Sequence, residues 1–265
     1  AMRARRFRAR SYLWGSLSKS MVCSRLAKRF LLSDFAYAHR GLWTEAGPVE
    51  NSLEACLAAA EQGLGIEFDV RPSKDGIPIL FHDPDLQRVC GEPERIETLM
   101  ADQLIGRPLL GGGEIISLEQ LLDAWPRTTP LLCELKIDGM TDPEAFARRV
   151  SEMVMAFDGP AACMSFSTEA VVALSPELMR GQLIAPTRAT EEENPHETAT
   201  ADVDYLACHT SDAAHPALQN ARSKTPLIVW TVRSEQACED LSSLTDSQIF
   251  EGFDPALAKR HILNT

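Results

Sequence analysis

Two carboxylates, Glu67 and Asp69, interrupt an otherwise apolar run at residues 65–70. They stand two positions apart, so in a β-strand both side chains project from the same face. Burying ionised groups in such a strand is costly unless they are paired or bind a metal. The spacing therefore indicates a functional site on this strand.

Ionisable residues also end the neighbouring apolar runs. His39 and Arg40 follow the first run, His82 ends the run after the second, and Glu134 and Lys136 close a later one. Any one of these has an ordinary explanation as a surface pair, a salt bridge or a turn. Polar residues at the carboxyl ends of barrel strands usually belong to an active site. Their occurrence together predicts that they converge at one mouth.

The residue types at this mouth favour a hard divalent cation. Three carboxylates, those of Glu67, Asp69 and Glu134, offer only oxygen ligands. Mg²⁺ and Ca²⁺ prefer such ligands, whereas Zn²⁺ prefers His and Cys. We therefore expect one Mg²⁺ or Ca²⁺ ion, and the sequence leaves the choice between them open.

The remaining residues are suited to phosphodiester cleavage. Arg40 and Lys136 would hold an anion, and the planar fork of Arg40 fits phosphate. His39 and His82 titrate near neutral pH and would serve as general acid and general base. The sequence does not decide which His has which role.

Alternating strands and helices must position these residues. The predicted strands are 35–39, 65–70, 131–136, 162–166, 181–185, 203–208, 227–232 and 248–253. The predicted helices are 51–63, 117–124, 142–157, 168–174, 211–222, 234–243 and 255–262, and no helix is assigned within 187–200. Eight alternations over one chain predict a (β/α)₈ TIM barrel, with an open doubly wound sheet as the alternative.

Two local features refine this fold. Asn51 is expected to cap the first helix, with Glu54 three residues later and Gly63 at its end. The run 77–82 follows the second strand too closely for a helical crossover, and Asp75-Gly76 precedes it as a hairpin signal. A two-residue turn there would place Asp69 opposite residue 82. Prolines on both arms make a shift of one residue the alternative register.

Charge divides the chain into a basic extension, residues 1–33, and a body, residues 34–265. The extension holds nine Lys and Arg residues and no acid; the body holds 17 basic against 38 acidic residues. A body this acidic excludes nucleic acid as a partner. The extension, a candidate amphipathic helix, could weakly contact a membrane surface or another protein. Oligomeric state is left open.

Cysteine usage and hydropathy indicate a cytoplasmic protein, with peripheral membrane contact through the extension as the alternative. Seven cysteines are scattered without a C-x-x-C pair, which favours free thiols in a reducing compartment. The extension lacks the apolar core and cleavage site of a signal peptide. No run of about 18 apolar residues occurs, so no membrane span is expected.

Short motifs occur in a fixed order along the chain: AHRG at 38–41, ENS at 50–52, EFDV at 67–70, DG at 75–76, HD at 82–83 and ELK at 134–136. SF at 165–166 and WTV at 230–232 follow. This order resembles the glycerophosphodiester phosphodiesterases over roughly residues 34–253.

The resemblance implies a metal-dependent hydrolase that converts a small glycerophosphodiester to sn-glycerol 3-phosphate and an alcohol. It implies a TIM barrel with a small insertion, a rim hairpin and loop, after the second strand. By position, the implied roles are metal ligand for Glu67, Asp69 and Glu134; acid–base pair for His39 and His82; phosphate or substrate contact for Arg40, Lys136 and Trp230; and support for Glu50 and Asn51.

The last barrel segment departs from the family pattern. The family commonly has G-x-D-G-I-I-T-D-x-P, whereas residues 248–255 read QIFEGFDP, and Arg233 stands where Asn often follows W-T-V. These changes are expected to affect head-group preference and to leave the metal and His positions untouched. A lysophospholipase D or sphingomyelinase D-like activity on lipid is the close alternative. A non-catalytic phosphodiester-binding barrel is the remote one.

Overall fold

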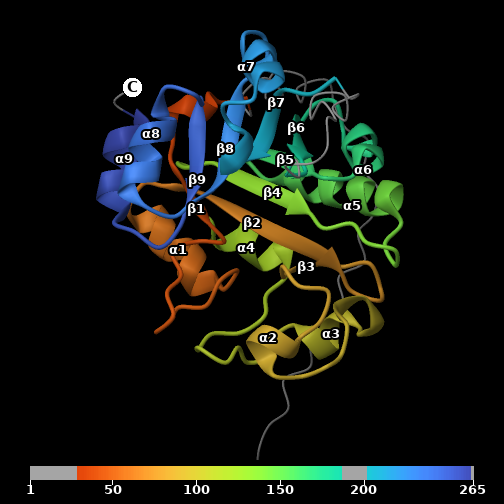
Figure 1. The fold of residues 1–265 in the computed structure, drawn as a ribbon. Helices are drawn as coiled ribbons and strands as arrows, with labels where there is room; N and C mark the ends of the chain where they lie inside the picture. Colours follow the sequence, from red (N-terminus) through yellow and green to blue (C-terminus); the bar gives the residue numbers. More distant parts are fainter. Residues whose placement is uncertain (1–28, 187–201, 264–265) are drawn as a thin grey trace, which may run out of the picture.

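Eight parallel strands close into a barrel in the computed structural model, which describes residues 29–186 and 202–263 (Figure 1). β1 pairs with β2 on one side and with β9 on the other, and this closure excludes the open sheet. The predicted (β/α)₈ barrel is thus confirmed. Its strands are β1 Tyr37–His39, β2 Gly65–Pro72, β4 Leu131–Leu135, β5 Ala161–Ser165, β6 Met179–Ile184, β7 Tyr205–His209, β8 Leu227–Val232 and β9 Ser247–Phe250.

Helices surround the barrel and bury its outer face (Figure 1). Each predicted helical segment contains one, within a few residues of the expected bounds. They are α1 Leu53–Glu61, α4 Leu118–Ala124, α5 Pro143–Ala156, α6 Thr168–Ala173, α7 Pro216–Arg222, α8 Glu235–Ser242 and α9 Pro255–Leu263, with short 3₁₀ turns η2 Leu32–Asp34 and η4 Thr210–Asp212.

Strand alternation sorts side chains between the two faces of the barrel. One buried cluster, inside the barrel, contains Tyr37, Leu132, Ile228 and Ile249. A second cluster, which the strands share with the surrounding helices, contains Phe68. Moving two residues further along the chain from the four positions named in the first cluster leads to His39, Glu134, Trp230 and Glu251. The apolar interior therefore forms the floor of a polar mouth.

The insertion after β2 is larger than a rim hairpin. It comprises β3 Pro78–Leu80, α2 Gln87–Cys90, η3 Ile96–Thr98 and α3 Ala101–Leu104, and it builds its own buried hydrophobic cluster. In Figure 1, α2 and α3 form a lobe away from the barrel helices. Helices this short carry little periodic signal, so the sequence pattern did not predict them.

The hairpin exists, but its predicted two-residue turn and its 69–82 pairing are wrong. Val70 pairs with Leu80 and Pro72 with Pro78, so the register is shifted by one residue, as in the alternative considered above. A five-residue loop, 73–77, replaces the tight turn, with Gly76 at φ 77°. The proline pair is tolerated because it occupies a non-hydrogen-bonded position of the ladder: beyond it, the Ser73 N–H still donates to the Ile77 carbonyl at 2.9 Å.

Asn51 does not cap α1. The cap is Ser52, whose side chain accepts a hydrogen bond from the Ala55 N–H. Asn51 instead has φ 57°, and its side chain turns toward β2. The predicted cap thus lies one residue before the actual one. The Asn51 side chain, predicted to cap the helix, lies instead at the mouth of the barrel.

Six cysteines in the described part of the chain are buried and free, as expected. Over the same residues, no helix is long and apolar enough to cross a membrane. The predicted extension lies outside the described residues except for 29–33, and so does the unassigned stretch 187–200.

Candidate active site

Three buried carboxylates meet at the mouth of the barrel. Glu67, Asp69 and Glu134 each offer an oxygen within 4.8 Å of the others' oxygens. β2 and β4 place them together because Asp69 and Glu134 are register partners in adjacent parallel strands. Neither carboxylate oxygen of Glu67 has a hydrogen-bond partner among the described residues, although both are buried.

Burial and mutual repulsion dominate the protonation of this trio. Burial, together with the charges of Asp69 and Glu134, raises the pKa of Glu67 well above its ordinary value. Burial likewise raises the pKa of Glu134, to about 7. Closely spaced carboxylate oxygens are the ligands that a hard divalent cation prefers, and those of Glu67 have no other partner among the described residues, so the residues present fit the predicted ion.

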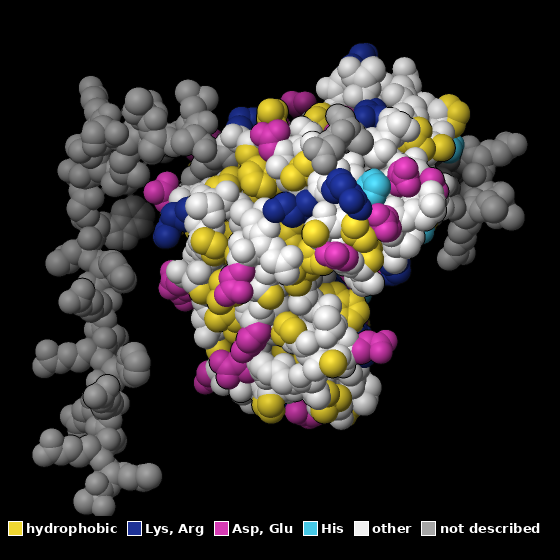
Figure 2. Space-filling model, turned by 90° about the vertical axis from the view of Figure 1, so that its left-hand side faces the viewer, with side chains coloured by type: hydrophobic (Ala, Val, Ile, Leu, Met, Phe, Trp, Pro, Cys, Tyr) yellow, Lys and Arg dark blue, Asp and Glu magenta, His cyan; other side chains and the backbone are white. Residues whose placement is uncertain are grey.

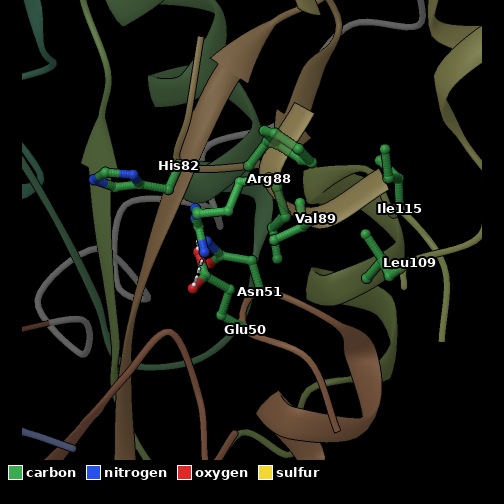
Figure 3. A pocket seen from close by; sticks show the side chains of 9 residues that line it. Glu50, Asn51, His82, Arg88, Val89, Leu109 and Ile115 are labelled. Carbon is green, nitrogen blue, oxygen red and sulfur yellow. Dashed lines mark hydrogen bonds and ion pairs between the residues drawn. The ribbon is translucent and has the colours of Figure 1, made fainter. Parts of the chain in front are cut away.

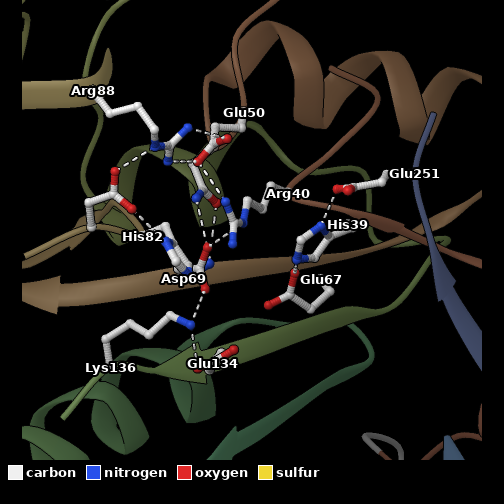
Figure 4. Close-up of polar contacts among 12 residues, drawn as sticks. His39, Arg40, Glu50, Glu67, Asp69, His82, Arg88, Glu134, Lys136 and Glu251 are labelled. Atoms are coloured by element: carbon white, nitrogen blue, oxygen red, sulfur yellow. Dashed lines mark hydrogen bonds and ion pairs between the residues drawn. The ribbon is translucent and has the colours of Figure 1, made fainter. Parts of the chain in front are cut away.

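Two cations lie against the trio. Lys136 Nζ stands 3.0 Å from Asp69 Oδ1 and 2.5 Å from Glu134 Oε1, and Arg40 Nε stands 3.1 Å from Asp69 Oδ2 (Figure 4). Burial opposes ionisation of Asp69, but the charges of Lys136 and Arg40 outweigh it and hold the pKa of Asp69 far below its ordinary value. The mouth thus contains carboxylates that can bind a cation and cationic side chains that can bind an anion.

A left-handed turn after β1 directs Arg40 into the mouth. Arg40 has φ 58°, its N–H donates to the Glu67 carbonyl at 2.7 Å, and its carbonyl accepts from the Asn51 N–H at 3.0 Å. A non-glycine residue in this region is strained and persists only where its surroundings fix it. A Cβ on the next residue, Gly41, would lie 2.5 Å from the Ala55 carbonyl carbon, so only glycine fits that close approach.

Glu50 and Asn51 support this arrangement. Glu50 accepts from Arg40 Nη1 at 2.8 Å, and Asn51 Nδ2 donates to Asp69 Oδ2 at 2.9 Å. The Asn51 side-chain carbonyl also accepts from the Asp69 N–H at 3.2 Å. The two residues fix one phosphate-binding candidate and one metal-ligand candidate, respectively.

His39 is held by a carboxylate from the far end of the chain. Its Nδ1 contacts Glu251 Oε2, and Glu251 Oε1 accepts from Arg233 Nε at 2.7 Å. Burial lowers the pKa of His39, and the hydrogen bond to Glu251 only partly offsets this. The expectation that the altered 248–255 segment leaves the His positions untouched is therefore wrong, because Glu251 lies within it.

His82 has a matching arrangement. Its Nδ1 lies 2.7 Å from Asp83 Oδ1, and Asp83 Oδ2 accepts from Arg88 Nε at 2.6 Å. Burial lowers the pKa of His82 as well. In both imidazoles a carboxylate occupies Nδ1, so that nitrogen carries the proton in the neutral ring and Nε2 is left to take or give one.

The insertion contributes directly to the mouth. Arg88, from α2, donates to Glu50 at 2.6 and 2.9 Å, and it packs beside Val89, Leu109 and Ile115 of the insertion cluster (Figure 3). The space among these side chains is only about 10 Å³. The insertion is therefore packed tightly against the site, with Arg88 as its polar contact.

Arg71 fixes the backbone of His82. Its Nε donates to the His82 carbonyl at 2.8 Å, and its Nη1 contacts Glu97 at 2.9 Å and Asp138 at 3.2 Å. Arg71 is buried on β2, Glu97 belongs to the insertion and Asp138 follows β4. One guanidinium thus ties His82 to three separate segments.

A cavity of about 250 Å³ joins these groups. Both His, Arg40, Lys136, Glu67 and Glu134 line it, together with Trp230 and Arg233. Trp230 packs edge-on against Phe166, with ring centroids 5.6 Å apart. The fold therefore brings together every residue singled out from sequence. Asp69, Glu50 and Asn51 do not line the cavity themselves, but each contacts Arg40, which does.

Sequence reasoning missed Arg71, Arg88 and Glu251. A signal existed only for Glu251, whose segment stood out as a departure from the family pattern. Arg88 and Arg71 carried none, because their contacts depend on how the insertion folds back onto the barrel.

Comparisons with known proteins identify a family for this chain. The model of the glycerophosphoryl diester phosphodiesterase family matches residues 39–250. A segment of 70 residues is 39% identical to human glycerophosphodiester phosphodiesterase 1; it covers 26% of this chain, and the chain spans about a fifth of that protein.

Two solved structures share the fold over nearly their whole length. A glycerophosphodiester phosphodiesterase from Parabacteroides distasonis superposes with a TM-score of 0.71 at 25% identity, covering 86% of this chain and 96% of that one. A phosphodiesterase from Oleispira antarctica, solved with its product sn-glycerol 3-phosphate, gives 0.70 at 24% identity over the same shares.

Proposed function

Because this chain belongs to the glycerophosphoryl diester phosphodiesterase family, we propose that it hydrolyses glycerophosphodiesters to sn-glycerol 3-phosphate and an alcohol with the aid of one divalent cation. The observation that carries the proposal is the meeting of three closely spaced buried carboxylates, two cationic side chains and two imidazoles around one cavity. The product bound in the Oleispira antarctica relative is of the expected class.

Glu67, Asp69 and Glu134 would hold the cation, and both carboxylate oxygens of Glu67 lack a hydrogen-bond partner among the described residues. A bound Mg²⁺ or Ca²⁺ would supply charge neutralisation for the phosphate oxygens and polarisation of the attacking hydroxyl or water. Arg40 and Lys136, now paired with carboxylates, would then face the phosphate, with Arg40 offering two parallel N–H donors.

His39 and His82 would carry the protons. One Nε2 takes the proton of the nucleophile as the new P–O bond forms, and the other gives a proton to the alcohol oxygen as the old P–O bond breaks. Burial lowers the pKa of both rings, which favours the uncharged form that the base needs, and the ring that acts as acid must hold a proton before the step. Glu251 and Asp83 keep each ring oriented.

The test is a metal-dependent assay over a panel of glycerophosphodiesters that reads both released products. We expect turnover with Mg²⁺ or Ca²⁺, none after chelation by EDTA, and a loss of about 10²- to 10⁴-fold in kcat for His82→Ala. His261→Ala is the matched control, since that His lies on α9 against Glu235 and does not line the cavity. Unchanged turnover after chelation, or in His82→Ala, would refute the mechanism.

A further inference from the structure

One cationic side chain at the mouth of the barrel has no part in the proposed chemistry. Arg233 directly follows β8, at the carboxyl end of that strand, and lines the catalytic cavity. The other ionisable residues that line this cavity hold the metal, bind the phosphate or transfer protons in the proposed function. Arg233 can therefore contact a part of the substrate that lies beyond the phosphodiester.

Most of the guanidinium of Arg233 is free to bind a ligand. Its Nε donates to Glu251 Oε1 at 2.7 Å, and neither terminal nitrogen has a partner among the described residues. A guanidinium carries five N–H donors in one plane, so those on the two terminal nitrogens remain. The side chain is 63% exposed, which leaves this end open to a molecule that enters the mouth.

The contact with Glu251 determines where these donors lie. Burial opposes ionisation of Glu251, but the contacts with His39 and Arg233 outweigh it and lower the pKa of the carboxyl. The carboxylate therefore stays charged and holds Arg233 by its Nε, while its other oxygen contacts His39 Nδ1. A group bound to the terminal nitrogens of Arg233 thus lies on the side of the cavity where His39 stands.

The chemistry of this side of the cavity favours an anion. Two parallel N–H groups of a guanidinium match the two oxygens of a carboxylate or a phosphate. The uncharged side chains that line the cavity are mainly apolar, among them Trp230 and Ile249, and they offer an anion no competing acceptor. A quaternary ammonium group, as in choline, is attracted to aromatic faces but repelled by a neighbouring guanidinium.

We propose that Arg233 binds an anionic group on the alcohol part of the substrate, so that the enzyme prefers glycerophosphodiesters whose alcohol carries a carboxylate or a phosphate monoester. The inference rests on the proposed function for the position of the phosphodiester alone. Arg233 stands where the family often has Asn, so the preference belongs to this chain rather than to the barrel.

The kinetic test compares substrates that differ in charge. One pair consists of the glycerophosphodiesters of 3-hydroxypropanoate and 3-hydroxypropanamide, which have nearly the same shape. The second pair consists of those of glycerol phosphate and glycerol. A charge-assisted hydrogen bond is worth more than an exposed ion pair, and Arg233 is partly exposed, so we expect kcat/KM to be about 5- to 20-fold higher for the anionic member of at least one pair. The pair that shows the gain distinguishes carboxylate from phosphate.

Substitutions at Arg233 supply the control. Arg233→Gln should abolish the preference, and Arg233→Lys should keep part of it, because Lys retains the charge without the planar fork. The readout is the ratio of kcat/KM within a pair, in which any common effect on His39 through Glu251 cancels.

The matched control is Arg260→Gln, which should keep the ratio of the parent. Arg260 lies on α9, is 59% exposed and also pairs with a glutamate, Glu235. Figure 2 views the molecule from the side of α8 and α9 and shows basic side chains interspersed with acidic ones. A loss of the preference in Arg260→Gln equal to that in Arg233→Gln would assign the preference to general surface charge and overturn the site.

A binding measurement separates this inference from the proposed function. Calorimetry in Mg²⁺ with the methyl phosphodiesters of 3-hydroxypropanoate and 3-hydroxypropanamide, which contain no glycerol hydroxyl, should show about 5- to 20-fold tighter binding of the anionic compound by the parent and equal binding by Arg233→Gln. This outcome supports the anion site even if no glycerophosphodiester is cleaved. Turnover of glycerophosphodiesters with no gain in rate or affinity for the anionic compounds, or with a gain that Arg233→Gln retains, would overturn the anion site and leave the proposed function standing.

Discussion

Replacing Glu134 by Gln should stabilise the metal-free protein at alkaline pH. In the absence of a cation, burial raises the pKa of Glu134 from 4.5 to about 7. A difference of this size corresponds to about 3 kcal/mol of destabilisation once the carboxyl is ionised. Gln has nearly the same shape and cannot ionise, so the variant avoids this cost.

The sign follows from proton binding. Between pH 4.5 and 7, the folded protein holds a proton on Glu134 that the unfolded chain has released, so the stability of the parent falls as pH rises. Above pH 7 both states are ionised and the effect is constant. Relative to the parent, the variant should therefore gain about 2–3 kcal/mol between pH 5 and 8.

Urea unfolding followed by circular dichroism in EDTA, at pH 5 and at pH 8, measures this gain. Glu144→Gln, which alters an exposed α5 glutamate, should shift the difference by less than about 0.5 kcal/mol. Saturating Mg²⁺ or Ca²⁺ should stabilise the parent, by about 2.7 kcal/mol at a hundred times Kd, and the variant much less. A variant that is less stable than the parent at pH 8 in EDTA, with no change between the two pH values, would refute the reasoning.

Three further outcomes follow from the contacts around the mouth. Glu251→Gln should lower kcat by about 10- to 100-fold, which is less than removal of His39 itself, and Glu251→Asp should recover part of the loss. Steady-state kinetics should show the lower kcat with KM unchanged, and full activity of Glu251→Gln would exclude a role of Glu251 in positioning His39. Arg88→Met should destabilise the fold by about 1–3 kcal/mol in urea unfolding, because Glu50 stays buried with fewer partners, and a change under about 0.5 kcal/mol would contradict this. Since burial lowers the pKa of both imidazoles, the acidic limb of kcat/KM for the general base should lie below pH 6.5; a limb above pH 7 would argue against either His as that base.

The sequence by itself determined the barrel and most of the mouth. Both rest on local periodicities: the alternation of a strand places Glu67 and Asp69 on one face, and short apolar runs separated by helical patterns give the order of elements. Because the carboxyl ends of parallel strands meet at one rim of a barrel, residues at these ends were expected to lie close together even though the order of the strands around the barrel was not known. His39, His82, Glu134 and Lys136 meet for this reason.

Only the tertiary structure decided the contacts that depend on closure and on the insertion. Glu251 reaches His39 because β9 closes against β1, joining positions 212 residues apart that no local pattern connects. Arg88 reaches the site from a lobe whose helices are too short to predict, and Arg71 on β2 contacts Glu97 of that lobe. The register that pairs Pro72 with Pro78 differs by one residue from the one that the turn motif alone indicated. Periodicity assigns a side chain to a face of its own strand, whereas its partner across the barrel is set by packing of the whole chain.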